Sequence, residues 1–221
     1  MVLDEQRSAA EVAEELGLSA STLRHWVAAE RDRRRGQWWA DQVAAVFEFL
    51  SDFGFTLVEV RASDWWEISA VYRAEHAALQ VVFSVEYQRV EVRLMRAALL
   101  DLPGRGSRDR FFVTGVPGMR GHLAHRLVER EAATAYAGLE PDRVAAALEF
   151  WAGVVREHAV GFLRGDLSLL DSWESGWDQV VVTVYVGDNV TDRQEASAVA
   201  RVRAVLPEAT VVTKRTVAQV R

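Results

Sequence analysis

The sequence predicts an α+β fold with a helical segment at its N-terminus. Residues 1–36 show helical spacing of apolar residues and no strand-like alternation. Apolar and polar residues alternate over residues 55–95, which is typical of antiparallel strands with one buried face. A strand–helix–strand pattern follows between residues 180 and 213. These three observations together favour α+β over an all-helical or all-strand class.

The composition is that of an ordinary globular protein. The chain has 221 residues, of which 50% are hydrophobic and 26% are charged, so it can bury a core and is not expected to be disordered. No apolar run approaches the roughly 20 residues that a membrane-spanning helix needs. The first residues are acidic rather than basic and apolar, unlike a secretion signal. We therefore expect a cytoplasmic protein with no membrane partner.

Cysteine content and net charge exclude several classes of site. With no cysteine, the chain cannot form disulfides, use a thiol nucleophile or build a cysteine-based zinc or iron–sulfur site. The formal net charge of −6 excludes a uniformly basic surface of the kind that coats nucleic acids. A contact with nucleic acid would therefore need a local basic cluster.

Helical signals fill the N-terminal part of the chain. Ser8 begins a capping-box spacing before a first helix. Gly17 interrupts the pattern, and Ser19 can cap a second helix. A further helix is predicted over residues 37–53, because large apolar residues recur there at spacings of three and four, and Gly54 can end it.

The central region predicts a meander of antiparallel strands. Alternating sets lie at residues 66–72, 79–85 and 90–94. The breaks at residues 74–77 and 86–89 have the length of hairpin turns. One face of this meander is expected to be buried and the other to face solvent.

The second half of the chain predicts a loop followed by alternating helices and strands. Residues 103–121 are rich in Gly and Pro and predict a loop with a short strand at residues 111–113. Helices are expected at about residues 120–136 and 141–164, and Trp151 is expected in the core. The last expected elements are a strand at residues 180–186, a helix that Thr191 caps, and a strand at residues 210–213, which can form a crossover between parallel strands.

Residues 8–30, SAAEVAEELGLSASTLRHWVAAE, carry the pattern of a helical hairpin. Ala13 stands where a small residue lets two helices approach closely, and Gly17 stands where the turn needs a left-handed backbone. Large apolar residues occupy the remaining core positions of such a hairpin: Val12, Leu16, Leu18, Leu23 and Trp26. With these residues, the segment resembles the helix-turn-helix of MerR-like regulators and of the DNA-binding proteins of insertion-sequence transposases.

The resemblance implies which side chains would meet DNA. Ala20, Ser21, Thr22, Arg24 and His25 would face the major groove. A guanidinium group can donate two hydrogen bonds to N7 and O6 of guanine, so Arg24 suits a base contact. The hydroxyl groups of Ser21 and Thr22 suit phosphate oxygens at a helix N-terminus.

A cluster of arginines replaces the family's usual wing. MerR-like proteins carry a glycine and a basic–aromatic wing after the second helix, and this chain has Arg31, Arg33, Arg34 and Arg35 instead. These arginines either contact phosphates beside the recognition helix or form a solvated helix end, where cations suit the helix dipole.

The expected organisation is a helix-turn-helix-like segment over residues 1–36 and an α+β sensing or assembly domain over residues 37–221. The expected function is a non-enzymatic DNA-binding protein, a regulator or mobile-element accessory, with double-stranded DNA as its partner. Because one recognition helix reads few base pairs, a homodimer is also expected. The apolar face of residues 39–53 and the edge strands of the meander are the expected dimer contacts.

A function of a different class stays open. Asp166, Asp171, Glu174 and Asp178 form an acidic stretch around two tryptophans, within residues 166–178. The stretch is either a docking surface for a basic protein or a polar loop with aromatic anchors. The first alternative would make the chain an immunity-type or other partner-binding protein.

Candidate catalytic and metal-ligating residues are few. His122, His125 and Glu129 have helical spacing, but no further ligand pattern supports a metal. Asp188 and Asp192 follow a predicted strand, but no glycine-rich phosphate cradle accompanies them. We therefore expect no catalytic site, no metal site and no cofactor.

Overall fold

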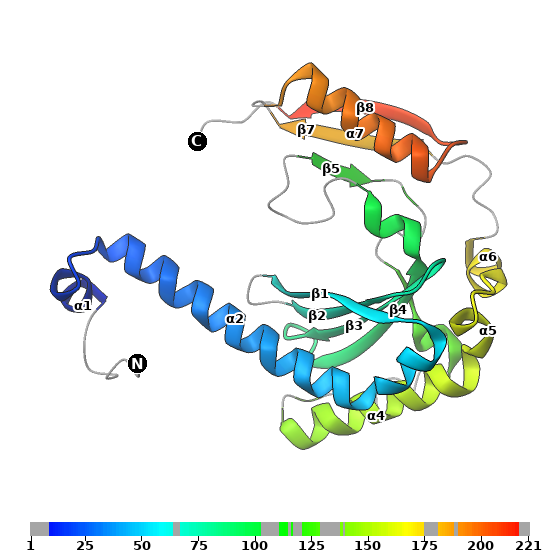
Figure 1. Cartoon of the computed structure of the whole chain (residues 1–221), viewed down its shortest axis with the longest axis horizontal. Helices are drawn as coiled ribbons and strands as arrows, with labels where there is room; N and C mark the ends of the chain where they lie inside the picture. The colour runs from blue at the N-terminus through cyan, green and yellow to red at the C-terminus, as the bar shows by residue number, and fades with distance from the viewer. Residues whose placement is uncertain are drawn as a thin grey trace.

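The structure is a computed structural model that describes residues 9–63, 67–102, 111–114, 116, 121–128, 138, 140–174, 181–187 and 190–216. It contains a helical arm, a five-stranded sheet covered by helices, and a separate three-stranded sheet with one helix (Figure 1). The predicted α+β fold is confirmed. Among the described residues, none of the helices combines the length and the apolar character that a membrane-spanning segment requires.

The N-terminal arm consists of α1 (Ala9–Glu15) and the part of the long helix α2 (Ala20–Val46) that precedes Gly36. The sequence predicted separate helices on either side of residue 36, but α2 runs through Gly36 without a break. It ends at Val46, and the rest of the predicted helix is the 3-10 helix η1 (Glu48–Phe53), which Gly54 closes with a φ of 76°. The first half of α2 projects away from the body, while its second half lies along the sheet (Figure 1).

The larger sheet is an antiparallel meander with one added strand. Its order is β1-β2-β3-β4-β6, and its bounds are β1 (Thr56–Ser63), β2 (Glu67–Arg73), β3 (Ala77–Ser84), β4 (Arg89–Arg96) and β6 (His122–Leu123). The hairpin turns lie where the sequence predicted them. All neighbouring pairs in this sheet are antiparallel.

One face of the sheet packs against α2 and α4 (Pro141–His158). Two buried tryptophans fix these helices. The indole N–H of Trp39 donates to the carbonyl of Val81 at 3.3 Å, and that of Trp151 donates to the carbonyl of Val90 at 2.9 Å. The shorter helices α5 (Val160–Leu163) and α6 (Ser168–Glu174) continue from α4.

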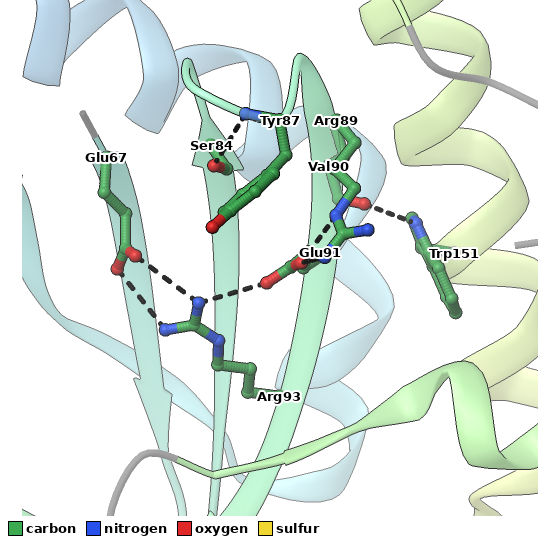
Figure 2. Close-up of polar contacts among 8 residues, drawn as sticks. All are labelled: Glu67, Ser84, Tyr87, Arg89, Val90, Glu91, Arg93 and Trp151. Atoms are coloured by element: carbon green, nitrogen blue, oxygen red, sulfur yellow. Dashed lines mark hydrogen bonds and ion pairs between the residues drawn. The ribbon is translucent and has the colours of Figure 1, made fainter. Parts of the chain in front are cut away.

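The prediction of a single buried face is wrong for this sheet. Every residue of β3 is buried, and the face away from the helices includes four buried polar residues: Ser69, Gln80, Ser84 and Glu91. Two contacts cover this face: an ion pair crosses β3, since Arg93 of β4 reaches Glu67 of β2 (Figure 2), and Ala97 packs with Ala78 and Met95. Long charged side chains can thus cover the small polar residues beneath them.

The helix predicted over residues 120–136 is not formed in its described part. Residues 122–123 instead form β6, which pairs with β4, and the 3-10 helix η4 (Ala124–Leu127) follows. Strand pairing satisfies backbone groups that a helix would have used, so the tertiary contact overrides the local pattern. Residues 129–137 lie outside the described residues.

The smaller sheet has the order β5-β7-β8, with β5 (Phe111–Thr114), β7 (Val181–Gly187) and β8 (Thr210–Thr216). β7 and β8 are parallel and are joined by α7 (Asp192–Val205), so the predicted strand–helix–strand crossover is confirmed. The predicted capping box of Thr191 and Gln194 is also present. These elements share a hydrophobic cluster of their own with the 3-10 helix η3 (Ala97–Asp101).

The packing of Gly36 gives a test of the continuous helix. A Cβ atom at Gly36 would lie 3.5 Å from Cγ1 of Val60, an ordinary contact. Because glycine inside a helix costs up to about 1 kcal/mol relative to alanine, Gly36→Ala should raise the free energy of unfolding by about 0.5–1 kcal/mol. Chemical denaturation measures this change.

Gly54→Ala is the matched control, because the φ of 76° at Gly54 disfavours any side chain. It should lower the free energy of unfolding by about 1 kcal/mol. A destabilised Gly36→Ala variant would contradict a straight helix packed on β1.

Candidate nucleic-acid interface

The tip of the arm is a hairpin of two helices with a small core of its own. Val12, Ala13 and Leu23 are buried together, and Ala20 packs against them. Gly17 makes the turn with a φ of 66°, a conformation that glycine adopts at no steric cost. The amide of Leu18 donates to the carbonyl of Ala13 at 2.8 Å and closes the end of α1. The hairpin therefore has a defined shape although its core is small.

Two of the predicted core positions are exposed, and a third, Leu18, is only half-buried. The side chains of Leu16 and Trp26 are 49% and 61% exposed, and Val27 beside Trp26 is 41% exposed. The reason is geometric: α2 continues straight into the arm, and no third helix among the described residues packs on this side of the hairpin. Trp26 therefore does not dock the hairpin on the body.

The N-terminus of α2 is organised around Ser19. Its hydroxyl oxygen accepts a hydrogen bond from the amide of Thr22 at 3.1 Å, which caps the helix. The hydroxyl groups of Ser21 and Thr22 lie 2.9 Å and 2.8 Å from the same oxygen. Three hydroxyl groups are thus gathered at the positive end of the helix dipole, where an anion is favoured.

The predicted arginines separate into two groups on α2. One group begins at Arg24, and Arg31 and Arg35 follow it by seven and eleven residues. With 3.6 residues per turn, this spacing places all three on one face of the helix. Arg24 and Arg31 are exposed and Arg35 is half-buried. None of the three makes a salt bridge within the part of the chain that the structure describes. We call these three residues the arginine stripe.

Arg33 and Arg34 form the second group and are both held by Glu30. Nε of Arg33 donates to Oε2 of Glu30 at 2.8 Å, and Nε of Arg34 donates to Oε1 at 2.7 Å. These hydrogen bonds, led by that of Arg33, lower the pKa of the Glu30 carboxyl to about 2. The structure therefore does not bring all four predicted arginines of this cluster together.

The sequence analysis did not identify Glu30 as a partner of these arginines, although its spacing from them indicates one. A glutamate three and four residues before two arginines on a helix is the usual spacing of intrahelical ion pairs. The remaining predicted residue, His25, is exposed on α2 beside Arg24. Ala20 is half-buried in the hairpin core and offers little free surface.

A second charged cluster lies on the polar face of the larger sheet. Arg93 contacts Glu67 at 3.4 Å and Glu91 at 3.0 Å, and Nε of Arg89 donates to Glu91 at 2.7 Å (Figure 2). Arg89 also lies over the ring of Tyr87. Glu91 is buried and its charge is balanced by the two arginines, so this cluster has the character of a structural ion-pair network.

The described part of the acidic stretch is bound to neighbouring side chains. Arg96 pairs with Asp171 and with Glu174, the latter at 3.1 Å. Glu174 also lies 2.9 Å from Nε2 of His122, whose ring packs near Trp173. Asp166 accepts a hydrogen bond from the amide of Ser168, which lowers the pKa of the Asp166 carboxyl. Asp178 lies outside the described residues.

The histidines that share helical spacing in the sequence do not share a helix. His122 belongs to β6, while exposed His125 belongs to η4. Glu129 and Asp188 lie outside the described residues, and Asp192 begins α7, where it pairs with Arg215. The described residues contain no group of three side chains suited to a metal ion.

No protein-family model matches the chain, and searches of curated proteins and of solved structures gave no match.

The ion pairs of Glu30 can be tested directly. Arg33→Ala should raise the pKa of Glu30 from about 2 toward its ordinary value of 4.5, because the strongest hydrogen bond to the carboxylate is lost. Since the pKa is lowered in the folded chain, the pairing is complete above about pH 4.5 and is lost as the pH falls toward 2. Carbon-13 NMR titration of the Glu30 carboxyl measures both the change in its pKa on substitution and the pH range over which the pairing is lost.

Arg35→Ala is the control on the same helix and should leave the Glu30 titration unchanged. Equal effects of the two substitutions would contradict the separation of the arginines into two groups.

Proposed function

We propose that the chain is a non-enzymatic DNA-binding protein, a regulator or mobile-element accessory, that contacts duplex DNA through the tip of its arm. The observation that carries the proposal is the arginine stripe, Arg24, Arg31 and Arg35, which continues from the capped N-terminus of α2 along one face of the helix. Positive side chains without salt-bridge partners among the described residues are available for phosphate oxygens, and contacts with phosphate dominate the affinity for DNA.

The projection of the arm supports this proposal. Along the axis of α2, Arg24 lies about 18 Å from Gly36, which is buried beside Val60 of β1, at 1.5 Å per residue. The major groove is about 8.5 Å deep, so the first turns of α2 can enter it before the body reaches the DNA. Arg24 would then reach a base edge, together with His25 and the hydroxyl group of Ser21.

Arg31 and Arg35 have a different role in this arrangement. They lie about 10 Å and 16 Å beyond Arg24 along the helix axis, which is more than the depth of the groove of about 8.5 Å, so their long side chains would reach back to the phosphates at its edge. Contacts of this kind fix the position of a recognition helix without reading sequence. Thr22 bonds to Ser19, and its hydroxyl group would join Ser21 near a phosphate at the helix N-terminus.

Glu30 gives the arm two unlike sides. It balances Arg33 and Arg34, so the side of α2 that carries them has less free positive charge than the arginine stripe. The chain as a whole has a net charge of −6, which opposes non-specific approach of DNA to the body. This distribution favours one orientation of DNA on the arm.

The alternative of a partner-binding body with an acidic surface has less support. Asp171 and Glu174 are already paired with Arg96, and a basic partner would have to displace that arginine. The described acidic residues therefore suit the polar-loop alternative better.

The first test compares arginines of the two groups. Arg31→Ala should reduce the slope of log affinity against log salt by about 0.9, the value for one phosphate contact. Arg24→Ala should cost about 1–3 kcal/mol on a preferred sequence if Arg24 makes a bidentate base contact. Fluorescence polarisation with a labelled duplex at several salt concentrations measures both.

Arg33→Ala is the matched control, because it removes the same charge from the same helix on the side held by Glu30. Its salt slope should equal that of the unsubstituted chain. Absence of binding to any duplex at low salt and tens of micromolar protein, or equal effects of Arg31→Ala and Arg33→Ala, would contradict the proposal.

A second test removes the arm. The main hydrophobic cluster begins at Trp39, so a chain that starts at Gly36 should keep its fold. Its cooperative unfolding should resemble that of the full chain, while DNA binding should be lost. Circular dichroism and polarisation measure the two properties, and a truncated chain that still binds DNA would place the binding surface on the body.

A further inference from the structure

The smaller sheet ends in an open strand. β8 pairs with β7 on one side only, and no described strand pairs with its other edge. Its sequence, TVVTKRT, is rich in β-branched residues, and Val212 is 39% exposed. Unpaired backbone groups along such an edge are able to bind another strand.

A groove lies beside this edge, between α7 and β8, with a volume of about 740 Å³. Ala196 and Val199 of α7 form one wall, and Val211 and Thr213 of β8 form the other. α7 buries the inward valines of β7, such as Val184, but covers the corresponding residues of β8 only in part, since Val211 is half-buried and Thr213 is exposed. The groove therefore offers a surface beside α7 against which a second helix on the same face of an extended sheet can pack.

The two ends of the groove carry opposite free charge. At one end, Arg215 pairs with Asp192 at 2.5 Å and with Glu195 at 2.9 Å, so two carboxylates share one guanidinium. At the other end, Arg203 is exposed and makes no salt bridge within the described residues. An excess of negative charge and an excess of positive charge thus lie at opposite ends of α7.

We infer that this surface binds a second copy of the chain, with β8 pairing antiparallel to β8 of the partner about a two-fold axis at Thr213. The two smaller sheets then form one six-stranded sheet, and the two α7 helices lie antiparallel on the same face. Each Glu195 meets Arg203 of the partner subunit, because the rotation exchanges the ends of the groove. A self-complementary surface of this kind is what a two-fold interface requires.

The spacing of the elements fits this arrangement. α7 contacts both β7 and β8, so its axis lies between them. Strands in a sheet are about 4.8 Å apart, and pairing of the two β8 strands would therefore separate the two helix axes by about 10 Å. This is close to the roughly 8–10 Å at which helices pack, and alanine at position 196 permits the close approach.

The register also keeps like charges apart. Rotation about Thr213 places Val212 opposite Lys214 of the partner subunit, and Val211 opposite Arg215 of the partner subunit. Neither basic residue of β8 lies opposite the same residue of the partner subunit. Like charges directly opposite each other would destabilise the paired strands. The inference does not depend on DNA binding, since the arm contributes nothing to this surface.

The test begins with the mass of the full chain without DNA. Sedimentation equilibrium is measured at protein concentrations from about 1 to 100 µM, which cover micromolar dissociation constants. At the highest concentration it should give twice the monomer mass of 24.7 kDa. Arg203→Glu should raise the dimer dissociation constant at least tenfold, because the new carboxylate faces Glu195 of the partner subunit. Arg201→Glu is the matched control, since Arg201 is exposed on α7 but does not line the groove.

A cysteine cross-link tests the register. Because the chain has no cysteine, Thr213→Cys introduces a single thiol at the two-fold axis, where directly opposite Cβ atoms come within about 4.5–5.5 Å. Mild oxidation should convert most of this variant to a disulfide-linked dimer, and should convert little of Ser197→Cys, which lies outside the groove. Circular dichroism confirms that each variant is folded.

A chain that stays monomeric at 100 µM overturns the inference. So does a dimer that Arg203→Glu and Arg201→Glu weaken equally, or a folded Thr213→Cys variant that fails to cross-link, because the contact then lies elsewhere. Loss of DNA binding by Arg24→Ala with an intact dimer leaves the inference standing, so the two proposals fail separately.

Discussion

The attachment of α2 to the larger sheet is the contact on which the rest of the structure depends. Trp39 is fully buried, its indole N–H bonds to the carbonyl of Val81, and Val43 packs one turn further along. This contact buries the apolar face of α2 that could otherwise have served as a dimer surface. It also fixes the direction in which the first half of the helix leaves the body, and therefore the position of every residue in the arginine stripe.

Ion pairs in this protein are used in two different ways. On the sheet, Arg93 spans β3 and links Glu67 to Glu91, so charged groups act as a cover over small polar residues. On the arm, Glu30 occupies two arginines and leaves the arginine stripe without a salt bridge to any described residue. In water such exposed pairs contribute little to stability. The pairs of Glu30 instead determine which arginines of α2 keep an unbalanced positive charge.

Local patterns predicted those parts of the fold that depend on neighbours in sequence. The alternation of Ile68, Ala70 and Tyr72 identified a strand face, and the spacing of Thr191 and Gln194 identified the start of α7. The continuity of α2 and the buried polar face could not be predicted, because both depend on contacts between distant segments. The sequence pattern suggested separate helices on either side of residue 36, whereas α2 continues through the buried Gly36.

The candidate site was predictable to a similar extent. The capped start of α2 and the buried pair of Val12 and Leu23 followed from the sequence, whereas the exposure of Trp26 did not, since it depends on the absence of a third helix from the described hairpin. The division of the arginines was available from spacing alone, once Glu30 is considered with them. Helical geometry therefore predicts more of this site than composition does.

Because α2 is continuous, a small tilt of the helix at the sheet produces a larger displacement at its tip. About 16 residues of α2 extend from Gly36 to the tip, a length of about 24 Å. A tilt of about 10° at the sheet would therefore carry the tip sideways by about 4 Å, more than the length of a hydrogen bond. Small adjustments in the packing of Trp39 and Val43 against the strands are thus converted into displacements large enough to align the tip with a surface or to misalign it.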